Sequence, residues 1–235
     1  MVIFFDLDDT LIPSTRFYDT VLKNIGIDPE GAMFLNGRKQ VKSNLPLQHV
    51  SARNRLLYFK NMLETSGNFT AQQTLDLMKN YEINLQTVVQ SYWHSNPDRL
   101  KIIQTLAKNF KIGILTNENC RTQLLKLTAM TGLENYIKYV VTSEEVGFEK
   151  PSAEMFKTMA NRFSIGFDEV VVVGDSIEND ILGAKNVGAH CVWHTEFITP
   201  SEYQKMQTQY SWINELSQSK SLQELSLLLL DLYGV

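Results

Sequence analysis

Short apolar runs recur along the chain and predict the strands of a sheet. None of them alternates strictly between apolar and polar residues, as the strand of a half-exposed sheet would. Uninterrupted apolar runs of this length are typical of strands that are buried on both faces of a parallel sheet. The predicted strands are residues 2–5, 112–115, 139–141, 170–173 and 191–193.

Amphipathic helical segments fill the spaces between the later strands. Within residues 98–109, the apolar residues Leu100, Ile103, Leu106 and Ala107 lie on one helical face. We predict further helices at 121–131, at 221–233 and at 152–163, where Pro151 suits a first helical turn. This alternation of strands and helices predicts an α/β fold with a doubly wound parallel sheet.

Residues 14–95 differ from the rest of the chain, because they contain helical patterns and no convincing strand. Such patterns occur, for example, at 50–65 and 70–81. The segment separates the first two predicted strands by about eighty residues, far more than an ordinary connection needs. We therefore expect an α/β core domain of residues 1–13 and 96–235, with an inserted helical domain at 14–95.

Composition and charge narrow the classes of function. The 235 residues carry a net charge of -4, which gives no general attraction to a nucleic acid polymer. No segment has the ~18 apolar residues of a membrane span, and the N-terminus lacks the basic region of a signal peptide. Cys120 and Cys191 show no zinc-site spacing, so we expect a cytoplasmic protein. The helix at 221–233 would dock on the core or form a dimer contact, so monomer and homodimer stay open.

Carboxylates follow two of the predicted strands. Asp6 and Asp8 come directly after the first, and Asp175 and Asp180 follow the run at 170–173. Near a protein surface, two like charges about 4 Å apart repel by roughly 4 kcal/mol. We therefore expect a catalytic role or a bound cation to keep them there. Oxygen ligands favour Mg²⁺, which usually contacts a substrate phosphate as well.

Three further polar residues are predicted to lie at the same edge of the sheet. Thr116 and Asn117 follow the second strand, and Lys150 precedes Pro151 in a loop that leads into a helix. In an open parallel sheet, ligands bind beyond the carboxyl ends of the strands. A hydroxyl and an ammonium group at that edge would hold phosphoryl oxygens. Alone, Thr116 and Asn117 would suit a helix start and Lys150 a solvated surface position.

Four motifs, taken together, resemble those of the haloacid dehalogenase (HAD) superfamily. They are Asp6-Leu7-Asp8-Asp9-Thr10-Leu11, Leu115-Thr116-Asn117, Glu149-Lys150-Pro151 and Gly174-Asp175-Ser176-Ile177-Glu178-Asn179-Asp180. They occur in the family's order and at compatible spacing, and the resemblance covers residues 1–13 and about 97–193. It implies a Rossmann-like core, and the inserted segment resembles a helical cap of the C1 type.

The resemblance implies a role for each matching residue in catalysis. Asp6 would attack phosphorus and form an aspartyl-phosphate, while Asp8 would act first as general acid and then as general base. Thr116 would bind the transferring phosphoryl group, helped by backbone amides near Asn117. Lys150 would neutralise both Asp6 and the phosphoryl charge.

The resemblance also implies a Mg²⁺ site. Its ligands would be the Asp6 carboxylate, the backbone carbonyl of Asp8 and the carboxylate of Asp175. Asp180 would anchor these ligands from outside, or reach the ion through a water molecule.

Asp8 separates the reactions of this family. Members that cleave carbon–halogen bonds or phosphonates lack an aspartate at this position. The resemblance thus implies a Mg²⁺-dependent phosphatase that hydrolyses small phosphomonoesters, such as sugar phosphates or nucleoside monophosphates. A phosphomutase would keep this aspartate, and a catalytically silent phosphate-binding protein would keep the fold, so both alternatives stay open. The sequence lacks the GxxxxGK[ST] motif of a P-loop kinase.

A basic group in the inserted segment supplies candidates for substrate recognition. Arg38, Arg53 and Arg55 lie, with further lysines, between Gly37 and Leu56. One or two of these arginines would face the crevice and meet an anionic substrate. The alternative is a helical face that is simply solvated.

Overall fold

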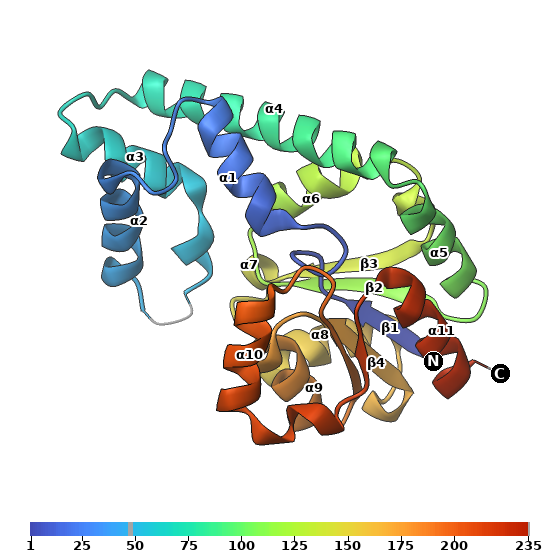
Figure 1. Cartoon of the computed structure of the whole chain (residues 1–235). Coiled ribbons are helices and arrows are strands. Elements are labelled where there is room, and N and C mark those ends of the chain that lie inside the picture. The colour runs from blue at the N-terminus through green and yellow to red at the C-terminus, as the bar shows by residue number, and fades with distance from the viewer. Residues whose placement is uncertain (47–48, 235) are drawn as a thin grey trace.

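A six-stranded parallel sheet forms the centre of the structure, a computed structural model that describes residues 1–46 and 49–234 (Figure 1). The strands stand in the order β3-β2-β1-β4-β5-β6, and each neighbouring pair is parallel. They are β1 (Val2–Phe5), β2 (Lys111–Thr116), β3 (Ile137–Thr142), β4 (Val170–Gly174), β5 (His190–His194) and β6 (Gln218–Ser219). The α/β fold predicted from the apolar runs is confirmed.

The central strand β1 is buried on both faces. Ile3 and Phe5 belong to one hydrophobic cluster, whereas Val2 and Phe4 belong to another, and none of the four is more than 3% exposed. This explains why the run shows no polar alternation, since each residue has an apolar neighbour whichever way it points.

Helices cover both faces of the sheet. The cluster that includes Phe5 also takes residues from α5 (Asp98–Leu106), α6 (Cys120–Ala129) and α11 (Leu222–Tyr233). The cluster that includes Phe4 takes residues from α8 (Ala153–Phe163) and α9 (Leu182–Val187). The remaining elements of this part are α7 (Ser143–Val146), α10 (Pro200–Gln209), and the short turns η2 (Leu133–Asn135), η3 (Phe167–Glu169), η4 (Ile177–Ile181) and η5 (Ser211–Glu215).

The segment between β1 and β2 is helical throughout most of its length. It forms α1 (Ser14–Asn24), α2 (Ala32–Asn44), η1 (Val50–Arg53), α3 (Arg55–Thr65) and α4 (Ala71–Ser95). In Figure 1, α2 and α3 lie together at a distance from the sheet, and α4 runs from them back toward α5. A single hydrophobic cluster joins Phe5 of β1 to Phe17, Phe59 and Tyr81 of these helices. The division of the chain into two domains stays a prediction.

Several helix boundaries differ from the predicted ones. The helix expected at 70–81 continues to Ser95, and α5 ends at Leu106 rather than at residue 109. The segment 50–65 is split at Asn54, whose side chain accepts a hydrogen bond from the Leu56 amide and caps α3. Pro151 lies before α8 rather than in its first turn, because Ser152 caps that helix.

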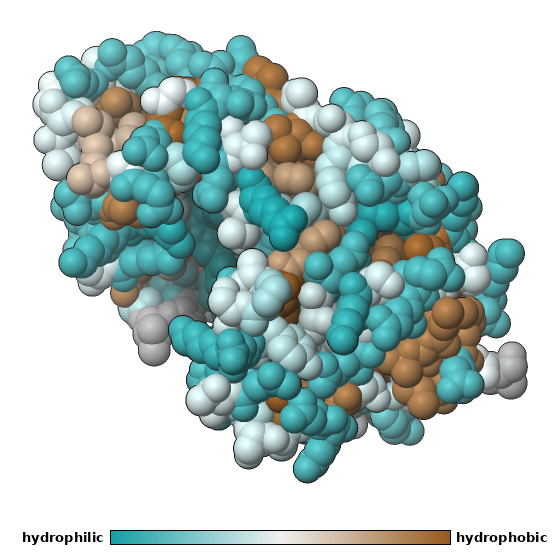
Figure 2. All heavy atoms as spheres, in the orientation of Figure 1, coloured by the Kyte–Doolittle hydropathy of each residue, from teal (hydrophilic) through white to brown (hydrophobic). Residues whose placement is uncertain are grey.

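Several elements, among them β6, α7, α9 and α10, were not predicted individually. β6 has only two residues, too few to show a periodic pattern. The terminal helix α11 was predicted, and Leu222, Leu225 and Leu229 are buried, but Leu232 is 47% exposed. Figure 2 shows an apolar area over α11, where Leu227 is exposed as well. Among residues 1–46 and 49–234, the structure has no helix with both the length and the apolar character to cross a membrane.

Glu196 connects three elements and sets one pH-dependent contribution to stability. Its carboxylate accepts hydrogen bonds from Arg99 of α5 (2.6 Å), from the Leu222 amide (3.1 Å) and from His194 (3.2 Å). Burial alone would raise the pKa of Glu196, but the hydrogen bonds from His194 and Arg99 outweigh it and lower the pKa from 4.5 to about 2. The ionised form therefore stabilises the fold.

We expect Glu196→Gln to lower the free energy of unfolding at neutral pH by about 2 kcal/mol. The folded pKa lies below the unfolded one, so this contribution is complete above 4.5 and is lost as the pH falls toward 2. Urea unfolding of the wild type and the variant at several pH values should show that the difference between their free energies of unfolding becomes smaller at acidic pH. A difference in the free energy of unfolding that does not change with pH would contradict a stabilising role for the ionised Glu196 carboxylate.

Candidate active site

The parallel register brings three polar positions to one edge of the sheet. Phe5 of β1 is paired with Ile114 of β2 and with Val173 of β4. Residues that follow these strands therefore lie side by side at the carboxyl edge, and the Asp6 amide donates to the Val173 carbonyl at 2.8 Å. A cavity of about 230 Å³ opens at this edge. Its lining includes every motif residue predicted to be functional, namely Asp6, Asp8, Thr116, Asn117, Lys150, Asp175 and Asp180.

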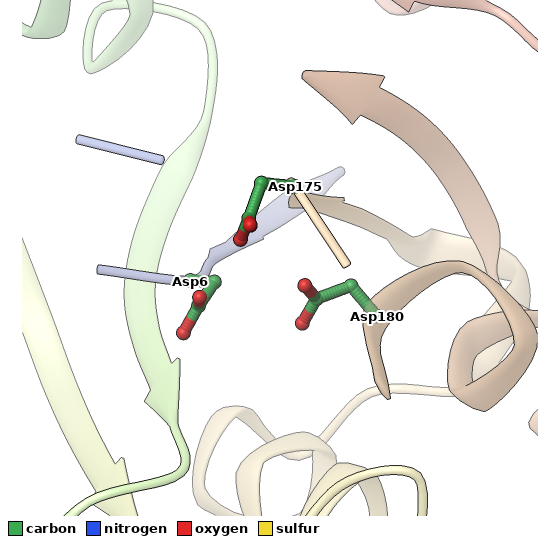
Figure 3. A group of neighbouring side chains, drawn as sticks. All are labelled: Asp6, Asp175 and Asp180. Atoms are coloured by element: carbon green, nitrogen blue, oxygen red, sulfur yellow. The ribbon is translucent and has the colours of Figure 1, made fainter. Parts of the chain in front are cut away.

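Three carboxylates converge on a common space in this cavity. Figure 3 shows Asp6 at the end of β1, Asp175 after β4 and Asp180 on η4, each turned toward the others. One oxygen from each lies within 4.8 Å of the other two. Asp180 comes this close because position 174 is glycine, where a Cβ atom would collide with the Asp180 carboxyl group.

The carboxylates carry more negative charge than their surroundings neutralise. Burial and the charges of Asp180 and Asp8 raise the pKa of Asp6 to about 7, although Lys150 acts in the opposite direction. Burial and the charges of Asp180 and Asp6 likewise raise the pKa of Asp175 well above its ordinary value. A hard divalent cation would relieve this repulsion, and the donors are all oxygens.

Lys150 is held among these carboxylates. Its ammonium group lies 2.6 Å from Asp180 and 2.9 Å from Asp6, and it donates to the Leu115 carbonyl at 2.8 Å. Burial by itself lowers the pKa of Lys150, but the charges of Asp180 and Asp6 outweigh it and raise the pKa above its usual value. Lys150 is therefore a permanent cation beside Asp6.

The side chain of Asn117 positions Lys150. It donates to the Lys150 carbonyl at 2.9 Å and accepts from the Lys150 amide at 2.6 Å. Asn117 was predicted to help bind phosphate, yet its side-chain amide is occupied by this pair of bonds. Any contact between Asn117 and a phosphoryl group would therefore involve its backbone amide, and this contact stays a prediction. Thr116, by contrast, accepts from Gln123 at 2.6 Å and keeps its own hydroxyl hydrogen to donate.

Asp175 is fixed by contacts from the turn after β1 and from strand β5. Its amide donates to the Thr10 hydroxyl at 3.1 Å, and that hydroxyl lies 3.3 Å from the Asp175 carboxylate. The indole of Trp193 on β5 donates to the Asp175 carbonyl at 2.7 Å. These bonds keep the carboxylate turned toward Asp6.

Sequence reasoning missed two residues that contact Asp8, and a third that contacts one of these two. Gln123 donates to its carboxylate at 2.9 Å, and Lys126 forms an ion pair with it. Lys126 is fully buried and also contacts the hydroxyl of Tyr18 on α1. Burial would raise the pKa of Asp8, but Lys126 and these hydrogen bonds lower it to about 2. A polar stripe at 119, 123 and 126, spaced as one face of α6, was the available signal.

The three arginines proposed for substrate recognition lie in different places. Arg53 lines the cavity with Asp6, and its guanidinium pairs with Glu149 at 2.9 Å. Arg55 forms an ion pair with Glu118 and lies over the ring of Tyr18. Arg55 and Arg38 line a neighbouring cavity instead, so one of the three reaches the carboxylate site directly.

Comparison with known proteins points to one family. A family model described as haloacid dehalogenase-like hydrolase matches residues 1–188. A glyceraldehyde 3-phosphate phosphatase of Pyrococcus abyssi is 28% identical over 204 residues, covering 82% of this chain and 80% of the relative. A ribulose-1,5-bisphosphate 5-phosphatase of Halopiger xanaduensis is 30% identical over 210 residues, covering 81% of this chain and 82% of the relative.

Solved structures share the fold. The HAD hydrolase YfnB of Bacillus subtilis, bound to magnesium, has a TM-score of 0.65 at 21% identity and covers 97% of both chains. A 2-haloacid dehalogenase of Pseudomonas syringae has a TM-score of 0.67 at 21% identity, covering 98% of this chain and 99% of the other. At this level of identity the likeness concerns the fold alone.

Proposed function

The chain belongs to the haloacid dehalogenase-like hydrolases, and from that premise we propose that it is a Mg²⁺-dependent phosphatase of small phosphomonoesters that acts through an aspartyl-phosphate. One observation carries the proposal. The Asp6 carboxylate lies 2.9 Å from the buried ammonium of Lys150, within a cluster of carboxylates that includes Asp175. This arrangement offers a nucleophile, a cation to neutralise a phosphoryl group, and oxygen ligands for a metal ion.

The donor set fits a hard divalent cation. Asp6 and Asp175 would hold it with their carboxylates, and Asp8 with its backbone carbonyl. Asp180 pairs with Lys150 at 2.6 Å, which suits a residue that anchors the ligands from outside. When bound, the ion would neutralise phosphoryl oxygens and align them with Asp6.

Residues of the chain account for each bond that is made and broken. An oxygen of Asp6 attacks phosphorus while the bond to the leaving alkoxide breaks, and Asp8 gives that alkoxide a proton. Water then attacks phosphorus, the bond to Asp6 breaks, and Asp8 takes the proton of the water. Lys150 and the Thr116 hydroxyl hold the phosphoryl oxygens through both steps.

Helices α1–α4 are proposed to act as a cap that selects the substrate and limits access of water. Two glutamates of the core pair with arginines of this segment. Glu149, the first residue of the third motif, pairs with Arg53, and Glu118, directly after the second motif, pairs with Arg55. We propose a cytoplasmic location, in keeping with Cys120 and Cys191, which are both free thiols. Monomer and homodimer both remain compatible with the proposal.

Phosphate release decides the proposed function. We expect the purified protein with Mg²⁺ to free inorganic phosphate from several members of a panel of sugar phosphates and nucleoside monophosphates. Chromatography of the same reactions should show dephosphorylated products. Rearranged phosphate esters with little free phosphate would indicate a mutase, and an unreacted panel would indicate a binding protein.

Removal of the metal, or of one of its proposed ligands, should abolish most of this activity. We expect EDTA to stop phosphate release and added Mg²⁺ to restore it. Asp175→Asn should raise the Mg²⁺ concentration for half-maximal rate by about a hundredfold, because one carboxylate ligand is lost.

The matched control is Asp168→Asn, an exposed aspartate beside the opposite end of β4. It should titrate with Mg²⁺ like the wild type. An Asp175→Asn variant with an unchanged metal requirement would remove Asp175 from the site.

A further inference from the structure

A second cavity adjoins the carboxylate site and lies among the helices of the inserted segment. Its volume is about 240 Å³, and its lining comes from α1, α2, α3 and α4 together with Arg53. Arg53 lines both cavities, so the two meet at this side chain. Figure 2 shows a hollow lined by hydrophilic residues between this helical part and the core. A substrate with its phosphoryl group at Asp6 and its remainder in the second cavity would pass Arg53.

Cationic side chains outnumber carboxylates among the residues that line this second cavity. Four of its residues are cationic, namely Arg38, Lys42, Arg53 and Arg55, against two carboxylates, Asp19 and Glu30. Arg38, Lys42 and both carboxylates are exposed at the rim of the cavity. Arg53 and Arg55 have glutamate partners. Arg38 and Lys42 form no ion pair or side-chain hydrogen bond with any residue in the two described ranges. Burial and then the charges of Arg38, Arg53 and Arg55 lower the pKa of Lys42.

An unsatisfied hydroxyl group lines the same cavity. Tyr81 is 1% exposed, and its hydroxyl lies near the Arg55 guanidinium but has no acceptor for its own hydrogen in the part of the chain that the structure describes. A buried hydroxyl whose hydrogen has no acceptor is unfavourable, so a ligand that accepts its hydrogen bond would be favoured. Two unpaired cations and one spare donor together match an anionic oxygen group.

We infer that the second cavity binds a second anionic group of the substrate, a phosphate or a carboxylate, at the end remote from the ester that is cleaved. Arg38 and Lys42 supply the charge, and the Tyr81 hydroxyl supplies a neutral donor. Arg53, which lines both cavities, lies between the two anion sites. This inference rests on the proposed function, because it assigns the first cavity to the transferring phosphoryl group.

Two sets of synthetic compounds, phosphonates that cannot be hydrolysed and the corresponding phosphate esters, test the inference without knowledge of the natural substrate. Binding of α,ω-alkane bisphosphonates, ω-phosphonoalkanoates and alkylphosphonates of matched chain length is measured by calorimetry with Mg²⁺ present. Turnover of the corresponding alkanediol bisphosphates, ω-phosphooxyalkanoates and alkyl phosphates is measured in parallel. Varying the chain length measures the distance between the two anion sites. Comparing the bisphosphonates with the phosphonoalkanoates shows whether the second site prefers a phosphate or a carboxylate.

We expect a doubly anionic ligand of suitable length to bind at least about tenfold more tightly than its singly anionic counterpart. Arg38→Gln and Lys42→Gln should each reduce that preference by about tenfold. Lys39→Gln is the control, since Lys39 is an exposed cation on the same helix that does not line the cavity. It should leave the preference unchanged.

The binding and turnover results separate two kinds of failure. Equal affinity for singly and doubly anionic phosphonates at every length, or a preference that survives Arg38→Gln combined with Lys42→Gln, would overturn the inference. If the preference is present but no ester in any series releases phosphate, the second anion site stands and the proposed phosphatase function fails. Circular dichroism of each variant identifies any loss of folding.

Discussion

Asp6→Asn is expected to abolish phosphate release, lowering kcat by at least about 10⁴-fold, as removal of a nucleophile does in other enzymes that use covalent intermediates. The amide keeps the size and shape of the carboxylate but cannot attack phosphorus. Steady-state assays with Mg²⁺ and incubation with substrate before mass spectrometry should show neither turnover nor a phosphorylated protein. A variant whose kcat is close to that of the wild type would exclude Asp6 as the nucleophile.

The same variant should be more stable than the wild type when metal is absent, which separates loss of chemistry from loss of fold. Burial, together with the charges of Asp180 and Asp8, raises the pKa of Asp6 from 3.8 to about 7. The folded protein therefore holds this proton more tightly than the unfolded chain. The associated stability is present below 3.8 and is lost as the pH rises through about 7.

Asparagine at position 6 carries no charge, so the variant does not bury an ionised carboxylate beside Asp180 and Asp8. In EDTA it should therefore unfold at a higher urea concentration than the wild type above pH ~7. The difference should shrink as the pH falls and Asp6 becomes protonated. A variant that is both inactive and less stable at pH ~8 would mean that Asp6 supports the fold and that its loss is not a clean test of chemistry.

The sheet was predictable because its strands are short and buried on both faces. β1 was placed at residues 2–5, as the structure has it. Such runs need nothing from distant parts of the chain to be recognised. The break at Asn54 and the two-residue strand β6 depend instead on a single side-chain cap and on a single neighbouring strand. Neither leaves a periodic signal.

The acidic part of the site was predictable for a related reason. In a parallel sheet, residues that follow neighbouring strands meet at one edge whatever the intervening chain does. Asp6, Asp175 and Asp180 did not require any knowledge of helix packing to be grouped. The structure groups them, and their roles in binding metal and phosphate stay predictions.

The residues that contact Asp8 could not be predicted from the order of the strands. Lys126 and Gln123 reach Asp8 from α6, across 118 and 115 positions of sequence. A lysine on a helix is usually exposed, and this one is fully buried because α6 packs against α4 and its ammonium reaches Asp8 and Tyr18. The pairing of Arg55 with Glu118 likewise depends on where the start of α3 lies relative to the loop after β2.

Asp8→Asn should slow the two half-reactions to different extents. Because Lys126 and its hydrogen-bonding neighbours overcome the effect of burial and lower the pKa of Asp8 to about 2, the group is ionised at neutral pH in the structure. It is then ready to accept a proton from water, whereas its action as an acid requires that it first gain one. With an alkyl phosphate, whose alkoxide needs that proton, we expect kcat to fall by about 10³-fold.

With p-nitrophenyl phosphate the leaving group needs little protonation, so the first half-reaction of Asp8→Asn should stay comparatively fast. Hydrolysis of the aspartyl-phosphate still lacks its base, and the intermediate should accumulate. Rapid mixing is expected to show a burst of one nitrophenolate per protein molecule, followed by slow turnover. Mass spectrometry of the quenched reaction should find one added phosphoryl group.

Lys126→Met distinguishes the charge of Lys126 from the chemistry of Asp8. It leaves the carboxylate in place but removes its buried counter-ion, so the pKa of Asp8 should rise and the base should become effective only at higher pH. The pH at which kcat is half-maximal should then move upward, without a burst of the kind expected for Asp8→Asn. If Asp8→Asn slows alkyl and nitrophenyl esters equally and shows no burst, Asp8 does not transfer protons. Its carboxylate would then serve to hold Lys126 and the turn that follows β1.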